Sequence, residues 1–353
     1  MQLTRTRSVL AVVLAAALTM ALTLVAPTRE ADAQSIPGLV SGVDVANHQH
    51  PGRGPINWKS VGTLGGQDFA FVKATEGSDY VNPFYLEDAK AAREAGLEVG
   101  AYHYARPAGD PVAQARHFAE TINSGPETSL PPVLDLEVEE GLSPAALIAW
   151  TRVFLLELER ASGKKPMVYT YRYFWYERMN NTNAFTNYPL WLAAYQNQPP
   201  RPVGGWDKLS FWQRSDNGRV VGIDTPVDMN LYNGTKAQLG QFAAGNLNAG
   251  GGVLEKFQVQ DSEELKVLEQ DNTKLVAAIL ALAAGGFGAG QLIEVAKTAG
   301  FDPTDAKNIT SLVKMLAGEG ELPVDDLRNM LLGNYQIGDL LILLDNAAKE
   351  AQG

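Results

Sequence analysis

The sequence predicts an α/β barrel followed by a small all-helical C-terminal domain. Three observations lead to this prediction. Short apolar runs alternate with helical patterns over residues 34–243, which is typical of parallel β/α units. The glycine-rich residues 245–252 then interrupt this pattern. All six tryptophans precede that stretch, so the two sides differ in composition.

In the first domain, strong capping signals fix the helices between the apolar runs. A helix over 83–95 ends at Gly96, a second over 111–123 has Asp110 as N-cap, and a third over 143–162 is capped by Ser143. Apolar runs between these helices predict buried strands, and their number favours a closed barrel over an open sheet. The predicted strands cover residues 42–45, 69–73, 99–104, 132–137, 167–171, 190–195, 209–214 and 227–230.

The second domain shows only helical periodicity. Its apolar stretch over 275–295 is broken by glycines near its middle, which favours a buried helical hairpin over insertion into a membrane. The predicted helices cover residues 261–283, 290–298, 303–317, 323–332 and 336–351.

The N-terminus has the pattern of a secretory signal peptide. Arg5 and Arg7 precede a long apolar run, and an Ala-Asp-Ala cleavage pattern ends at Ala33. The alternative is an uncleaved membrane anchor, and both place the remaining chain outside the cytoplasm. The predicted division is 1–33 signal peptide, 34–243 catalytic barrel, 244–254 linker and 255–353 helical domain.

Charge and cysteine content exclude several classes of function. The net charge of −11 argues against nucleic acid as a partner. The absence of cysteine excludes disulfides, thiolate metal sites and a cysteine nucleophile. The sequence shows neither a phosphate-binding P-loop nor a nucleophile elbow, and we expect no cofactor.

Asp135 and Glu137 stand two positions apart in the predicted strand 132–137. Side chains at positions i and i+2 of a strand share a face, so both carboxyl groups are expected to project together. Like charges disfavour joint ionisation, so one carboxyl is expected to keep its proton near neutral pH. Glycoside hydrolysis uses such a pair, an acid for the leaving oxygen and an anion for the developing positive charge. The alternative is a surface strand with two solvated acids.

Two more strands carry an acid at one end. Asp44 follows Val43 near the expected mature N-terminus, and Asp228 lies near the end of the first domain. Buried strands rarely contain acids, and barrel strands that present them at one end would form a single acidic cleft.

With these residues in place, residues 41–243 resemble glycoside hydrolase family 25, the Chalaropsis-type lysozymes. The matching motifs occur in the family's order and cover nearly the whole first domain, but not the helical domain. They are Gly42-Val43-Asp44-Val45, Asn47-His48-Gln49, Ile56-Asn57-Trp58, Phe71-Val72-Lys73-Ala74-Thr75-Glu76-Gly77, Gly100-Ala101-Tyr102-His103-Tyr104, Val133-Leu134-Asp135-Leu136-Glu137, Leu190-Trp191-Leu192-Ala193, Phe211-Trp212-Gln213 and Val227-Asp228-Met229-Asn230.

The resemblance implies an irregular, flattened TIM-like barrel that hydrolyses the β-1,4 bond between N-acetylmuramic acid and N-acetylglucosamine in peptidoglycan. It implies Glu137 as general acid, with Asp135 assisting, and Asp44 and Asp228 lining the same cleft. Whether the substrate's N-acetyl group or Asp135 acts on the anomeric carbon stays open, since both routes retain the anomer. This chain departs from the family pattern at Ala46 and in the segment 51–55, which puts substrate contacts there in doubt.

Aromatic side chains near strand ends are candidates for sugar stacking, with core packing as the alternative. Glu76 follows a strand and is a candidate for closing the cleft, with a simple turn as the alternative. We expect His103 to be a packed, hydrogen-bonded side chain, and we expect no metal at His48 and His50 because no third ligand is near. The aromatic candidates are Tyr102, Tyr104, Tyr171, Trp191 and Trp212.

Two other functions use the same barrel. One is a catalytically silent glycan-binding protein, and the other hydrolyses another N-acetylated glycan such as chitin. The helical domain has few aromatics and no tryptophan. It is interpreted as a contact for a protein partner, for self-association or for the cell surface, or as a stabilising appendage.

Overall fold

The computed structural model of the protein describes residues 38–257 and 267–352. The predicted signal peptide lies outside the described residues. The described residues fall into two compact units, 38–257 and 267–352.

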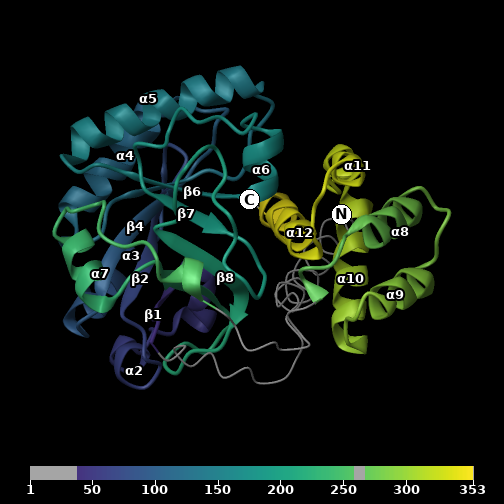
Figure 1. Ribbon diagram of the computed structural model, residues 1–353, viewed down its shortest axis with the longest axis horizontal. Helices are drawn as coiled ribbons and strands as arrows, with labels where there is room; N and C mark the ends of the chain where they lie inside the picture. Colours follow the sequence, from purple (N-terminus) through teal and green to yellow (C-terminus); the bar gives the residue numbers. More distant parts are fainter. Residues whose placement is uncertain (1–37, 258–266, 353) are drawn as a thin grey trace, which may run out of the picture. The chain divides into compact units, whose positions relative to one another are not determined.

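Eight strands of the first unit close into a barrel, which confirms the barrel prediction (Figure 1). Around the barrel their order is β1-β9-β8-β7-β6-β5-β4-β2, and pairing of β1 with β2 closes it. A short ninth strand, β3 (Tyr80–Val81), pairs antiparallel with the end of β2. The barrel strands are β1 (Val40–Val45), β2 (Phe69–Glu76), β4 (Glu98–Tyr104), β5 (Val133–Asp135), β6 (Met167–Tyr171), β7 (Leu190–Ala193), β8 (Phe211–Gly218) and β9 (Val227–Tyr232).

The last strand breaks the parallel arrangement. Strand β9 runs antiparallel to both of its neighbours, β1 and β8, so the prediction of a wholly parallel sheet was wrong there. The reason is the short connection between Gly218 and Val227, because a parallel crossover needs about a dozen residues or more. This reversal places the start of β9, with Asp228, at the same end of the barrel as the end of β1.

Helices cover the outside of the barrel, and α4 and α5 lie side by side there (Figure 1). The predicted caps are confirmed: Asp110 accepts a hydrogen bond from the Ala113 amide at 2.7 Å, and Ser143 accepts one from Ala146. The helices of this unit are α2 (Trp58–Thr63), α3 (Tyr85–Glu94), α4 (Pro111–Ser124), α5 (Pro144–Ser162), α6 (Arg172–Glu177) and α7 (Lys236–Ala243), with 3-10 turns at Asn47–Gln49, Pro51–Arg53 and Leu254–Lys256.

Aromatic rings fill the barrel at the amino ends of its parallel strands. Phe211 packs edge-on against Phe69 and Phe71, and Phe242 of α7 packs against Phe211 and Tyr232. Gly42 lies opposite Phe69 in the sheet, and any Cβ there would overlap the Phe69 ring. Glycine is therefore required at this position so that the ring can lie across β1. This apolar base leaves polar side chains to gather at the other end of the barrel.

The glycine-rich stretch after α7 packs on the barrel unit. The Tyr232 hydroxyl donates to the Ala249 carbonyl at 2.8 Å, and the Lys208 ammonium donates to the Gly250 carbonyl at 2.8 Å. Asn233 donates to the Glu255 carboxylate at 3.0 Å. Several barrel side chains therefore hold this segment in place.

The second unit is helical, as predicted. Asp302 caps α10 by accepting hydrogen bonds from the Thr304 and Asp305 amides. The first complete helix of this unit begins at Thr273, and residues 268–272 before it are not helical, so the predicted continuous helix over 261–283 was wrong there; its first residues, 261–266, lie outside the described residues. Among the described residues, no helix combines the length and apolar character needed to span a membrane. The helices are α8 (Thr273–Ala283), α9 (Ala289–Thr298), α10 (Pro303–Glu319), α11 (Val324–Leu332) and α12 (Ile337–Gln352).

Candidate active site

Strand ends bring three of the predicted acids into the barrel. Asp44 lies near the end of β1, Asp135 is the last residue of β5, and Glu137 follows two residues later. All three are buried, with exposed fractions of 5, 6 and 5%. The predicted strand 132–137 is shorter in the structure, because β4, its partner, ends opposite Asp135. Glu137 therefore lies in the segment that follows the strand, although the Leu136 amide still bonds to the Tyr169 carbonyl at 3.0 Å.

Tyr169 of β6 lies near these acids. Burial raises the pKa of the Tyr169 phenol well above its ordinary value, and the charges of Glu137, Asp135 and Asp44 raise it further. The three carboxylates must therefore be near one fully buried hydroxyl. Sequence reasoning missed Tyr169, although it shares a strand face with the candidate Tyr171 at i+2.

Two amide side chains hold the Asp44 carboxylate. Asn230 donates to Asp44 Oδ2 at 2.6 Å, and Gln213 donates to the same oxygen at 3.1 Å. The Asn230 oxygen accepts a hydrogen bond from the Trp191 indole at 2.8 Å, and the Gln213 oxygen accepts one from the Tyr169 hydroxyl at 2.8 Å. Because an indole nitrogen only donates, it fixes the orientation of the Asn230 amide. Two amide donors thus hold Asp44 through one carboxylate oxygen.

We expect Asn230→Ala to lower the free energy of unfolding by roughly 2–4 kcal/mol, because the indole N–H of Trp191 and an Asp44 oxygen each lose a buried partner. Thermal unfolding of both proteins measures this change. The control is Asn246→Ala at an exposed position. Equal shifts of the two midpoints would show that the Asn230 side chain does not hold this network.

Asp228 occupies the rim of the same region. It pairs with Asp44 across the antiparallel β1–β9 ladder and is half-buried. Asp228 shares a strand face with Asn230, whose side chain contacts Asp44. The structure therefore brings all four predicted acids to one end of the barrel, with Asp228 the most exposed of them.

Glu76 is engaged by two cations at the end of β2. Its carboxylate lies 2.5 Å from Lys73 Nζ and 2.6 Å from Arg106 Nη2. Burial raises the pKa of Glu76, but the charges of Lys73 and Arg106 outweigh this and leave the pKa below its ordinary value. Tyr104 lies between the same two cations, 5.0 Å from Lys73 Nζ and 5.2 Å from Arg106 Cζ, measured to the ring centre. The site candidate Glu76 thus belongs to a charged cluster at the rim.

The other aromatic candidates differ in burial. Tyr102 is half-buried, whereas Tyr171 is buried and lies near Tyr173 and Phe174. The Trp191 ring stacks on Phe71 with 4.5 Å between ring centres, and Trp212 donates its indole N–H to the Ala194 carbonyl at 2.7 Å. Both indoles are almost fully buried in this structure.

His103 and His50 are buried and hydrogen-bonded, as the sequence predicts for His103. This ring contacts the Thr75 hydroxyl at 2.8 Å and the Gln114 amide oxygen at 3.1 Å. Burial lowers the pKa of His103 to about 3, so the ring is neutral. His50 contacts Asp88 at 2.8 Å and the Gly54 carbonyl at 2.8 Å. Within the two described stretches, no group of three or more histidines and acids could hold a metal ion.

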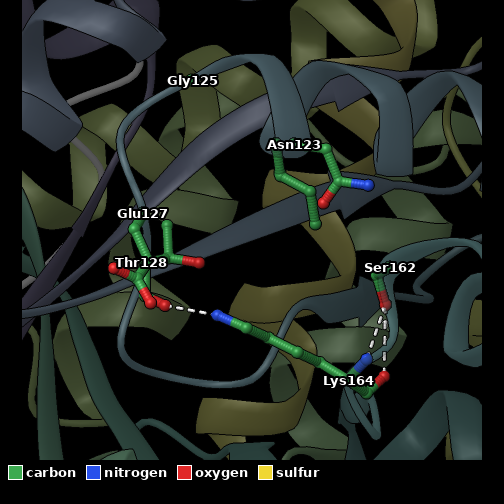
Figure 2. A pocket seen from close by; sticks show the side chains of 7 residues that line it. Asn123, Gly125, Glu127, Thr128, Ser162 and Lys164 are labelled. Carbon is green, nitrogen blue, oxygen red and sulfur yellow. Dashed lines mark hydrogen bonds between the residues drawn. The ribbon is translucent and has the colours of Figure 1, made fainter.

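A cavity of about 180 Å³ lies at the opposite end of the barrel (Figure 2). Thr128 precedes β5 and Lys164 precedes β6, so the cavity is at the amino ends of strands whose carboxyl ends carry the acids. The Lys164 ammonium reaches across it to the Thr128 carbonyl at 2.5 Å (Figure 2). This cavity is therefore separate from the acidic site. Its lining consists of Ile122, Asn123, Gly125, Glu127, Thr128, Ser162 and Lys164.

Comparison with known proteins gives a consistent result for the barrel. Residues 43–223 match the model of glycosyl hydrolases family 25. Lysozyme M1 of Streptomyces globisporus is 34% identical over 210 residues, which cover 57% of this chain and 70% of that protein. The N,O-diacetylmuramidase of Chalaropsis sp. is 33% identical over 220 residues, covering 58% of this chain and 100% of that protein.

A solved structure resembles the barrel in fold as well as in sequence. The bacterial lysozyme from Streptomyces coelicolor is 33% identical, with a TM-score of 0.54, and the match covers 59% of this chain and 98% of that one. The family match includes Asp44, Asp135 and Glu137 and ends five residues before Asp228. Since it spans just over half of the chain, the protein belongs to glycosyl hydrolase family 25 and is a glycoside hydrolase.

Proposed function

We propose that the protein hydrolyses the β-1,4 bond between N-acetylmuramic acid and N-acetylglucosamine in peptidoglycan, with Glu137 as general acid. The observation that carries this proposal is the group of buried carboxylates around Tyr169, at the carboxyl end of a family 25 barrel. Relatives described as lysozyme and N,O-diacetylmuramidase support the same substrate class.

The proposed roles follow from burial and charge. Glu137 protonates the leaving glycosidic oxygen, and a buried carboxyl suits this role because burial favours its protonated form. Asp135, on the same short segment, supports the positive charge at the anomeric carbon, either directly or through the substrate's N-acetyl group. Asp44, held by its two amide donors, supplies a fixed negative charge to the same cleft. Asp228 at the rim completes the acidic cleft.

Sugar contacts are proposed for the aromatic candidates near the strand ends. The half-buried Tyr102 is the best placed, since a sugar ring needs an accessible face, whereas Tyr104 is buried and lies against Lys73 and Arg106. Tyr171, Trp191 and Trp212 would require movement before they could stack on a sugar, because they are buried.

We also propose export of the protein and removal of residues 1–33, on the strength of the signal-peptide pattern. The proposed division is then the catalytic barrel 34–243, the connecting residues 244–254 and the helical domain 255–353. The helical domain is proposed to contact a protein or the cell surface.

The test of this function is the identity of the new reducing end. Purified peptidoglycan is digested with the wild-type protein, the products are reduced with borohydride, and the reduced sugars are identified by mass spectrometry. We expect reduced N-acetylmuramic acid. Reduced N-acetylglucosamine would assign a different bond, cleavage of chitin oligomers alone would assign another glycan, and wall binding without release would indicate a binding protein.

A further inference from the structure

The segment that follows Glu137 contains a backbone conformation that non-glycine residues rarely adopt. Glu140 has a φ of +45°, in the left-handed region, and Gly141 follows with a φ of +80°. A glutamate in this region persists only where its surroundings hold it there. Because Glu140 is three residues from Glu137, what holds Glu140 also restricts the position of the proposed acid.

The Glu140 carboxylate has two partners on the β4–α4 connection. Arg106 Nη1 donates to Glu140 Oε1 at 3.3 Å, and the Ala108 amide donates to Glu140 Oε2 at 2.8 Å. In the same segment, Glu139 has a cationic partner, since Arg178 lies 3.4 Å from its carboxylate. Charged side chains therefore contact this short turn at two successive residues.

Arg106 is itself fixed by groups that do not move with the turn. Its Nε donates to Glu76 Oε1 at 2.8 Å, and Nη2 lies 2.6 Å from the same oxygen. The Gln114 side chain bonds to the Arg106 backbone twice, accepting from the amide at 3.0 Å and donating to the carbonyl at 2.6 Å. Gln114 also contacts the buried His103 ring. The guanidinium thus connects the end of β2 to the turn after Glu137.

We propose that Arg106 and Glu140 are positioning residues, which hold the turn at 138–141 so that Glu137 meets the glycosidic oxygen. The inference rests on the proposed role of Glu137. It also gives Glu76, the sequence's candidate for closing the cleft, a role in orienting Arg106. Charge-assisted hydrogen bonds to a forked guanidinium suit this role because they restrict direction as well as distance.

The test is the kinetics of Glu140→Asn beside Glu140→Gln. Asparagine tolerates the left-handed backbone, but its side chain is one methylene shorter and cannot bridge to Ala108 and Arg106. We expect kcat to fall about 10- to 100-fold in Glu140→Asn, with KM within about twofold and an unchanged unfolding midpoint. Glutamine keeps an acceptor for the Ala108 amide and is expected to recover much of the rate.

A double-mutant cycle with Arg106→Met provides the second readout. If the two side chains act as one unit, their effects on kcat are less than additive. The control is Glu94→Gln, which removes an exposed carboxylate 3.9 Å from Lys90 and should leave kcat unchanged. If the wild type is active and Glu140→Asn keeps the full kcat, the positioning role is refuted and the proposed function stands. Additive effects of the Glu140 and Arg106 substitutions on kcat would refute it in the same way. A wild type that releases no sugar would refute the proposed function, and the positioning role with it.

Discussion

Glu137→Gln is expected to reduce the rate of glycan cleavage by about 10³-fold or more, because an amide of the same size has no proton to give to the leaving oxygen. Glutamine keeps the volume of the buried side chain, so the fold should be retained. Release of reducing ends from purified peptidoglycan measures the effect. Wall binding should persist, since the proposed substitution removes chemistry and leaves the sugar contacts in place.

Glu139→Gln is the matched control for this experiment. It makes the same chemical change two residues further on, at a half-buried glutamate that lies 3.4 Å from Arg178. Its proposed contribution is to the shape of the turn, so we expect a loss of tenfold at most. If Glu137→Gln retained the wild-type rate, Glu137 would not be the acid. If both variants lost activity equally, the effect would be a general disturbance of the turn.

Much of the fold could be predicted because its signals are local. The caps at Asp110, Ser143 and Asp302 fix helix starts within a few residues of chain. The reversal of β9 was missed because the prediction ended the preceding strand at residue 214, which left twelve residues before the strand 227–230, enough for a parallel crossover. In the structure β8 continues to Gly218, and the connection that remains is too short for one.

The acids of the site could be predicted from local sequence, but the side chains that hold them could not. Carboxylates in apolar strands stand out in a sequence, so the acids were found. Gln213 and Asn230 carry no charge, and they reach Asp44 over 169 and 186 residues of chain, so no local pattern indicates their role. One of the two partners of Glu76 was hidden for the same reason, since Arg106 is 30 residues away, whereas Lys73 is only three residues away.

Acid is expected to destabilise the barrel unit through His103. Its pKa is lowered from 6.5 to about 3 in the folded protein, because burial disfavours the charged ring. Between these two values the unfolded chain binds a proton that the folded chain does not, so stability falls as the pH falls. This one group should cost about 3 kcal/mol between pH 7 and pH 4.

Tryptophan fluorescence can follow this unfolding, because all six tryptophans belong to the barrel unit. The comparison is with His103→Gln, which cannot become charged. The His103→Gln protein should be less stable than wild type at pH 7, since the glutamine side chain fits the contacts of the ring imperfectly. It should, however, lose less stability between pH 7 and pH 4. The carboxylates of the barrel contribute equally to both proteins. Parallel curves of stability against pH for the two proteins would therefore show that His103 is not responsible.

The helical unit should respond to pH in the opposite sense through Asp305 of α10. This carboxyl is buried, and burial, reinforced by the charge of Asp302, raises its pKa from 3.8 to about 7. Between these values the folded unit holds a proton that the unfolded chain has released, so stability falls as the pH rises from about 4 to about 7. Hydrogen exchange of α10 should therefore slow towards pH 4, after correction for intrinsic rates, while the barrel loosens. In Asp305→Asn the α10 trend should disappear and the barrel trend should remain. If the substitution changed neither trend, ionisation of Asp305 would have no part in the stability of this unit.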